Sequence, residues 1–186
     1  MKRRVRSLIT MSLVAGSLLV YSCGDNKKNN EEEVSEDHME MTESSPEMET
    51  EEVANAEFSN DTIKIAFDDY LAIKDALVQT DAKAAGEAAK ELQAYLETSN
   101  PELAGIAGNI AKEEDVNKQR EVFSELTAAM DPVLKEAISS GKIYKQFCPM
   151  AFEGKGDYWY STSEEIRNPY FGDKMLKCGR VDETIE

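Results

Sequence analysis

Hydrophobic and polar residues follow a helical period between residues 60 and 140. In the segment DTIKIAFDDYLAIKDALVQT, apolar side chains recur every three or four positions, which gathers them on one face of a helix. The same spacing returns in TDAKAAGEAAKELQAYLETSNP and in two later stretches, at about residues 101–113 and 115–140. The pattern therefore predicts four consecutive amphipathic helices.

The predicted helix boundaries rest on residues that begin or end helices. Asp61 has the side chain of a helix N-cap, and Pro101 ends the second helix because the residue before a proline resists helical geometry. Pro132 is expected to kink or interrupt the fourth helix, since it lacks a backbone N–H. Short connections favour antiparallel neighbours. We therefore expect an all-α fold, an up-and-down bundle of about four helices, with Tyr95 and Met130 at core positions.

From Lys142 onward the helical pattern disappears. IYKQFC alternates between apolar and polar side chains, which is typical of a short extended segment, and EGKGDYWY places a turn before an aromatic run. Eight of the fourteen aromatic residues lie between Tyr144 and Phe171. Because such an aromatic load is unfavourable in water, we expect residues 142–186 to form an irregular, aromatic-rich C-terminal cap that folds against the bundle.

The first 22 residues have the composition of a secretory signal. Basic residues precede an apolar run from Leu8 to Tyr21, which is short for a membrane span. The sequence LVYSC resembles a bacterial lipobox, in which Cys23 becomes the lipidated first residue. Residues 1–22 are therefore expected to be a lipoprotein signal peptide, with an ordinary signal peptide or an uncleaved anchor as alternatives. The expected location is the cell envelope, on the periplasmic or outer-membrane side, with lipid on Cys23 as the membrane anchor.

Residues 23–57 are expected to be a disordered acidic tether. Residues 24–57 hold thirteen acidic side chains, two lysines and no aromatic residue, too little apolar surface to offset the entropy of ordering. The tether also contains one histidine and three methionines: His38, Met39, Met41 and Met48. Imidazole and thioether groups suit Cu(I) or Ag(I). These residues are either weak auxiliary metal ligands or incidental residues of a solvated spacer.

The charge and the histidine content exclude several functions. The chain has 37 acidic and 21 basic residues, a formal charge of -16. Nucleic acid is therefore not expected as a partner, because phosphate binding needs a basic surface. The single histidine, His38, lies in the tether. A folded domain without histidine lacks the usual base of serine and cysteine hydrolases and the ligands of H-E-x-x-H zinc sites, so we expect no enzymatic activity.

Four sulfur-containing residues in the cap have three interpretations. Cys148 and Met150 lie in C-P-M, and Met175 and Cys178 lie in M-L-K-C. Two short turns can thus present two thiols and two thioethers to one Cu(I) or Ag(I) ion. The alternative is a Cys148–Cys178 disulfide, which closes a loop of about 30 residues and stabilises the fold by roughly 3–4 kcal/mol. A reactive exposed thiol is the third interpretation, although neither a C-x-x-C motif nor a histidine accompanies the cysteines.

Two sequence blocks carry a similarity to a known family. They are YLAIKDALVQTDAKAAGEAAKEL in the helical part and YKQFCPMAFEGKGDYWYSTSEEIRNPYFGDKMLKCG in the cap. Over about residues 60–186 the chain resembles the domain of unknown function 3347 family, known mainly from secreted proteins of Bacteroidota. Members look like stand-alone lipoproteins or extensions of heavy-metal efflux adaptors. The resemblance therefore implies copper or silver handling, with an efflux adaptor as a partner.

We therefore expect a lipid-anchored, extracytoplasmic, non-catalytic binding protein for Cu(I) or Ag(I) that serves metal homeostasis or efflux. The folded domain is expected over residues 58–186, with Cys148, Met150, Met175 and Cys178 as metal ligands. The alternative function is a disulfide-pinned protein-interaction module that docks on another component of the cell envelope.

Overall fold

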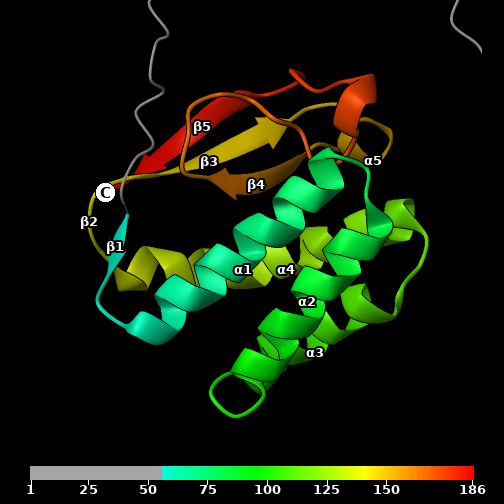
Figure 1. The fold of residues 1–186 in the computed structure, drawn as a ribbon. Coiled ribbons are helices and arrows are strands. Elements are labelled where there is room, and N and C mark those ends of the chain that lie inside the picture. The colour runs from blue at the N-terminus through cyan, green and yellow to red at the C-terminus, as the bar shows by residue number, and fades with distance from the viewer. Residues whose placement is uncertain (1–55) are drawn as a thin grey trace, which may run out of the picture. The chain divides into compact units, whose positions relative to one another are not determined.

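A computed structural model describes residues 56–186 of the protein (Figure 1). In chain order, the elements of this range are β1 (Glu57–Phe58), α1 (Asp61–Val78), α2 (Ala82–Leu96), α3 (Pro101–Lys112), α4 (Val116–Ala137), β2 (Ile138–Ser140), β3 (Ile143–Cys148), α5 (Ala151–Gly154), β4 (Asp157–Ser161), the 3-10 helix η1 (Gly172–Lys174) and β5 (Arg180–Ile185). Every helix of this range is too short or too polar to traverse a membrane.

Most of the N-terminal features expected from the sequence lie outside the described residues. These are the signal peptide, Cys23 and the tether up to residue 55. The last two residues of the expected tether are part of the fold, since Ala56 is buried and Glu57 opens β1.

Each of the four long helices in the described range begins at a side chain that accepts a hydrogen bond from a backbone N–H of the first turn. The caps are Asn60, Asp81, Asn100 and Asp115, with oxygen–nitrogen distances of 2.7, 2.9, 3.2 and 2.8 Å. Such caps satisfy N–H groups that have no partner inside the helix. The cap of α1 lies one residue before the predicted Asp61, and α4 continues without interruption through Pro132.

The prediction of an all-α fold is wrong, because residues 56–186 form a mixed α/β fold with helices and two antiparallel sheets. β1 pairs with β2, and the second sheet has the strand order β4-β3-β5. The expected extended segment IYKQFC is β3, the central strand. The cap is thus built around a three-stranded sheet rather than being irregular throughout. The sequence predicts no strand at β4 or β5, because β4 has only five residues and β5 is largely charged and exposed.

The three-stranded sheet lies across the side of the helical layer formed by α1 and α4 (Figure 1). β4 is the strand that packs on both of these helices. α2 and α3 pack on each other, and they join the layer through α1 and α4 respectively. The core therefore lies among the four long helices and extends to the inner face of the sheet, where Trp159 and Tyr160 of β4 are buried.

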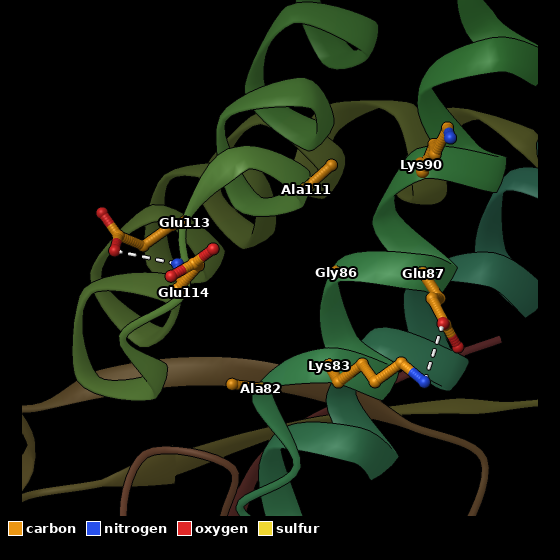
Figure 2. A pocket seen from close by; sticks show the side chains of 8 residues that line it. All are labelled: Ala82, Lys83, Gly86, Glu87, Lys90, Ala111, Glu113 and Glu114. Carbon is orange, nitrogen blue, oxygen red and sulfur yellow. Dashed lines mark hydrogen bonds and ion pairs between the residues drawn. The ribbon is translucent and has the colours of Figure 1, made fainter. Parts of the chain in front are cut away.

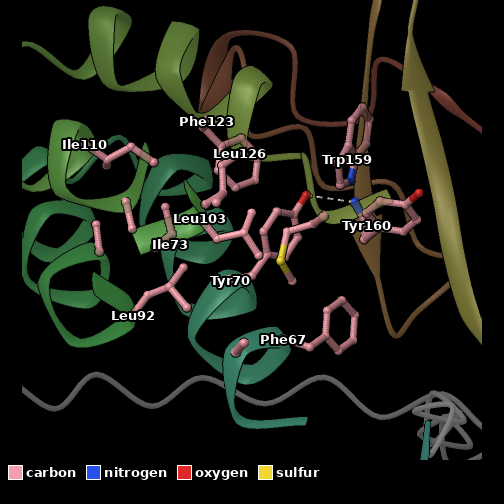
Figure 3. Packing of buried hydrophobic residues seen from close by; sticks show 14 of the residues in the cluster. Phe67, Tyr70, Ile73, Leu92, Leu103, Ile110, Phe123, Leu126, Trp159 and Tyr160 are labelled. Atoms are coloured by element: carbon pink, nitrogen blue, oxygen red, sulfur yellow. Dashed lines mark hydrogen bonds between the residues drawn. The ribbon is translucent and has the colours of Figure 1, made fainter. Parts of the chain in front are cut away.

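Tyr70 of α1 lies at the centre of this core (Figure 3). Its ring stacks on Phe123 of α4, with centroids 5.0 Å apart, and meets Tyr160 of β4 edge-on at 6.3 Å. Its hydroxyl accepts the backbone N–H of Tyr160 at 3.1 Å and shares a hydrogen bond of 2.8 Å with the hydroxyl of Thr127. The helices and the sheet are thus joined by both apolar contact and buried hydrogen bonds.

Two residues expected in the helical core have different outcomes. Met130 is fully buried, as predicted. Tyr95 is 38% exposed, so its predicted core position is wrong. The buried residues of α2 recur at steps of four, three and four positions, namely Ala85, Ala89, Leu92 and Leu96. Tyr95 lies beside this stripe and faces water.

Candidate functional site

Cys148 and Cys178 lie beside each other at one end of the three-stranded sheet. Cys148 is the last residue of β3, and Cys178 lies two residues before β5 begins at Arg180. The antiparallel ladder pairs Phe147 with Arg180, so the residue after Phe147 and the residues before Arg180 come close together. The two Sγ atoms are 3.5 Å apart, and both cysteines are free thiols. The fold therefore brings together the two cysteines that the sequence singled out.

The distance between the two sulfur atoms permits two kinds of chemistry. At 3.5 Å it is longer than the ~2.05 Å of a disulfide bond, so the structure shows reduced thiols in contact. With metal–thiolate bonds of about 2.3 Å, as in zinc sites, two thiolates on one ion lie at most about 4.6 Å apart. The observed separation falls between these limits. The separation is therefore compatible, after small side-chain movements, with either a disulfide or two sulfur ligands on one ion.

The two thiols differ in exposure and in acidity. Cys148 is fully buried and belongs to the hydrophobic core, whereas Cys178 is partly exposed. Burial raises the pKa of the Cys178 thiol, and its hydrogen bond and electrostatic interaction with Cys148 raise that pKa further. Cys178 therefore keeps its proton at neutral pH, and a bound cation has to displace that proton.

Asn168 holds the segment that carries Cys178. Its backbone N–H donates to the carbonyl of Leu176 at 2.9 Å, and its side-chain amide donates to the carbonyl of Cys178 at 2.7 Å. Its Oδ1 accepts from the N–H of Tyr170 at 2.8 Å, and its carbonyl accepts from the N–H of Gly172 at 3.0 Å. Because Asn168 is fully buried, these bonds replace the hydrogen bonds that water would make. The N-P-Y-F-G motif thereby fixes the backbone of Cys178.

Gly179 lets the chain pass close to a buried tryptophan. A Cβ atom at this position would lie 2.9 Å from the carbonyl oxygen of Phe147 and 2.9 Å from Cη2 of Trp159. Any larger residue therefore displaces one of these neighbours. Trp159 is fully buried, and its ring meets Tyr170 edge-on with centroids 6.1 Å apart. An aromatic wall thus lies beside the turn that follows Cys178.

The two methionines of the expected site lie on the turns that carry the cysteines. Met150 follows Cys148 by two residues and is 52% exposed. Met175 is half-buried, and its carbonyl accepts the N–H of Cys178 at 3.0 Å, which closes the M-L-K-C turn. Within residues 56–186, no three carboxylate, imidazole or thiol groups lie close enough to hold one metal ion. The other residues expected to act in metal binding or anchoring, which are Cys23, His38, Met39, Met41 and Met48, lie outside the described residues.

A pocket of about 460 Å³ lies between α2 and the loop that joins α3 to α4 (Figure 2). Its floor is formed by small residues, and its rim is charged, with Lys83, Glu87, Lys90, Glu113 and Glu114. Lys83 pairs with Glu87 at 3.6 Å, and a carboxylate oxygen of Glu113 accepts the N–H of Glu114 at 3.0 Å. Three of the five charged rim residues thus interact with one another or with the backbone.

A smaller pocket of about 260 Å³ between α4 and the sheet contains a polar network that the sequence did not reveal. Asp131 of α4 accepts hydrogen bonds from the ammonium of Lys145 and from the hydroxyl of Tyr160. Lys145 also lies over the ring of Tyr158, 4.7 Å from its centroid. Burial opposes the charge of Asp131, but the hydrogen bonds from Lys145 and Tyr160 prevail and lower the pKa of its carboxyl. Only the packing of α4 on the sheet brings these residues together.

The comparison with protein families concerns the helical part of the chain. Residues 66–141 match the family described as protein of unknown function (DUF3347). The matched segment runs from α1 to the residue that follows β2, so both cysteines lie beyond it. The resemblance of the C-terminal motifs to the same family therefore stays a prediction. No curated protein and no solved structure matches the chain. Residues 66–141 of the chain are thus similar to the DUF3347 family of proteins of unknown function.

Proposed function

We propose that the protein is a lipid-anchored, extracytoplasmic binding protein for Cu(I) or Ag(I), which serves metal homeostasis or efflux and catalyses no reaction. The observation that supports this function best is the 3.5 Å contact between the thiols of Cys148 and Cys178. Soft ions prefer thiolate and thioether ligands to carboxylates and water. Lipid on Cys23 is the proposed anchor, and an efflux adaptor or another envelope protein is the proposed partner.

The set of available ligands favours soft monovalent ions over zinc. A structural zinc ion takes four ligands from cysteine, histidine and carboxylate side chains. In the described domain the thiol pair has no third side chain of these types beside it. Cu(I) and Ag(I) accept sulfur ligands, and the thioethers of Met150 and Met175 are the nearest further sulfur donors along the chain. The proposed site therefore consists of two thiolates with one or two thioethers.

Metal binding at this site is coupled to the loss of thiol protons. An ion that binds both cysteines as thiolates displaces two protons if both are thiols beforehand. The apparent affinity then rises about 100-fold for each unit of pH until the first thiol ionises. Burial raises the pKa of the Cys178 thiol, so the proton of Cys178 contributes to this dependence throughout the neutral pH range.

A competition experiment tests the proposal. The reduced full chain, carrying Cys23→Ser so that two thiols remain, is titrated with Cu(I) in the absence of oxygen against a coloured Cu(I) chelator. We expect about one tightly bound ion per chain. Cys148→Ser and Cys178→Ser should each weaken binding by at least about 100-fold, because each removes one thiolate. Unchanged affinity in either variant would reject the site.

Methionine variants separate the ligands from ordinary core residues. Met150→Leu and Met175→Leu should each weaken Cu(I) binding by about 3- to 10-fold if their thioethers coordinate the ion. Met130→Leu is the matched control, because Met130 is buried in the core between the helices. Replacement of His38, Met39, Met41 and Met48 by alanine should leave the tight site intact and remove only weakly bound ions.

The same geometry supports a second candidate, a disulfide-pinned interaction module. The thiols already lie in contact, and a bond between them would tie the end of β3 to the start of β5. Titration of free thiols in protein isolated from the cell envelope distinguishes the candidates. Two reactive thiols after unfolding count against the disulfide, whereas none before reduction supports it.

A further inference from the structure

The two cysteines are unequally exposed, so a reagent from solvent can reach only one of them directly. Cys148 is 0% exposed at the end of the central strand β3. Cys178 is partly exposed on the turn before β5. A reagent that arrives from solvent therefore meets the sulfur of Cys178, while the sulfur of Cys148 can be reached in the folded protein only through its 3.5 Å contact with Cys178.

We propose that Cys178 and Cys148 undergo ordered thiol–disulfide exchange with a low-molecular-weight disulfide, written R–S–S–R. In the first step the small fraction of Cys178 that has lost its proton attacks, as a thiolate, one sulfur of the reagent, forms a Cys178–S–S–R mixed disulfide and releases RS⁻. In the second step the thiolate of Cys148 attacks the Sγ of Cys178, forms the Cys148–Cys178 disulfide and releases the second RS⁻. The protein loses two electrons and two protons, and R–S–S–R is reduced to two molecules of RSH.

The surroundings of the pair suit the second step. The sulfur of Cys148 already lies in contact with the atom that it attacks, so the reaction needs rotation of side chains rather than movement of strands. Asn168 holds the carbonyl of Cys178 at 2.7 Å and keeps the turn in place while the side chain reacts. Trp159, packed against Gly179, closes the buried side of this turn. The mixed disulfide should therefore be short-lived.

One consequence rests on the proposed function. A disulfide offers no thiolate, so the oxidised pair should not hold Cu(I) or Ag(I), and the redox state of the pair would then control metal binding. The ordered exchange itself does not depend on metal.

The order can be tested with oxidised glutathione and intact-mass measurement. The starting protein is the full chain with Cys23→Ser, reduced and free of metal. It should lose two hydrogens without accumulating an adduct. In the chain that carries both Cys23→Ser and Cys148→Ser, one stable glutathione adduct should form on Cys178. In the chain that carries both Cys23→Ser and Cys178→Ser, glutathione should modify Cys148 about 100-fold or more slowly than it modifies Cys178 in the other variant. The reaction of Cys148 then requires local opening of the core.

Two further measurements keep the test decisive. In denaturant, Cys148 of the Cys178→Ser variant should react as fast as an ordinary cysteine, which shows that burial protects it. Without any substitution at the pair, a short pulse of an alkylating reagent on the reduced protein should label Cys178 before Cys148. Equal labelling of both residues, or an adduct that accumulates with both cysteines present, would overturn the proposal.

The experiments on thiol–disulfide exchange and on Cu(I) binding test the two proposals independently. If exchange follows the predicted order and the reduced protein fails to bind Cu(I), only the proposed function is rejected. If the reduced protein binds Cu(I) and Cys148 reacts as fast as Cys178, only the ordered exchange is rejected.

Discussion

The guanidinium of Arg120 on α4 donates from Nε to the backbone carbonyl of Pro169 at a distance of 2.7 Å. The same guanidinium donates from Nη2 to the carbonyl of Leu77, at the end of α1, at 3.0 Å. Arg120 is only 5% exposed, and burial lowers the pKa of its guanidinium. Its hydrogen bonds therefore offset the loss of water around a buried cation. They also join the family-matched helices to the C-terminal part of the chain.

Replacement of Arg120 by methionine should destabilise the domain by about 3 kcal/mol. The substitution leaves the carbonyl of Pro169 buried without this donor, which costs about 1–3 kcal/mol. It also removes one donor from the carbonyl of Leu77, which keeps its hydrogen bond from the N–H of Thr80. Urea unfolding followed by circular dichroism measures the loss. Arg167→Met is the matched control, because Arg167 is exposed on the same C-terminal segment, and it should change stability by less than about 0.5 kcal/mol. Equal effects of the two variants would contradict the role of Arg120.

A chain that ends at Gly141 should not fold cooperatively, although it contains the whole family-matched segment. It lacks Tyr160, which covers Tyr70, and it lacks the partner of Arg120 at Pro169. Exposure of the aromatic face of the helices removes the apolar burial that holds them together. Residues 56–141 should show a broad, non-cooperative urea transition, whereas residues 56–186 should show a single sharp one. A sharp transition in the shorter chain would mean that the helices are an independent domain.

Tyr70→Phe should destabilise the protein by about 1–3 kcal/mol without a change in fold. The missing hydroxyl leaves the N–H of Tyr160 and the hydroxyl of Thr127 buried without their partner. Burial also raises the pKa of the Tyr70 phenol well above its ordinary range, so the group stays neutral in any physiological buffer. Tyr95→Phe removes a hydroxyl from a 38% exposed ring and serves as the control, with an expected change below about 0.5 kcal/mol. Thermal unfolding of both variants checks the difference.

Two glycine-to-alanine substitutions should change the free energy of unfolding in opposite directions. Gly179→Ala brings a Cβ atom to 2.9 Å from Trp159 and should cost about 2 kcal/mol through overpacking, with a shift of the neighbouring Cys178. Gly105→Ala places a Cβ on α3 with nothing within 4 Å and should stabilise the protein by about 0.5–1 kcal/mol. Denaturant midpoints compare the two variants. A stabilising Gly179→Ala would show that the chain passes Trp159 at a greater distance.

Asp131 should contribute a stability that depends on pH. The pKa of its carboxyl in the folded protein is lowered below the ordinary value of 3.8, so the folded state favours the charged form. The contribution is therefore complete above the pKa of the unfolded chain and is lost as the pH falls through the lower folded value. At pH 7, Asp131→Asn should cost about 2 kcal/mol, because the interactions with Lys145 and Tyr160 weaken.

The free energies of unfolding of wild type and Asp131→Asn should converge as the pH falls through the lowered folded pKa of Asp131, below which both side chains are neutral. Glu121→Gln removes an exposed carboxylate from the same helix and should leave only a small difference at every pH. A gap between wild type and Asp131→Asn that stays constant between pH 7 and pH 2.5 would rule out the charge of Asp131 as its source.

The helices could be predicted from the sequence because their signals are local. A helix is closed by hydrogen bonds between residues four apart, and its caps lie within three residues of the groups they satisfy. Asp81 and Asn100 begin helices close to where the sequence predicts them. The alternation in IYKQFC likewise predicted the extended β3. The prediction for Tyr95 was wrong because Tyr95 and Leu96 are adjacent in the sequence and lie on neighbouring faces of α2. Only the face that carries Leu96 is buried.

The sequence by itself determined the four helices, one strand, and two cysteines as the candidate pair, since each follows from residues close together in the chain or from composition. Tertiary structure alone decided the sheet, the thiol contact, the hydrogen bonds of buried Arg120, the network of partly buried Asp131, and the contact of Tyr70 with Tyr160. These features join residues that are 30 positions apart for the sulfurs, 49 for Arg120 and Pro169, and 90 for Tyr70 and Tyr160. Contacts over such distances depend on how whole elements pack, and local periodicity carries no record of that packing.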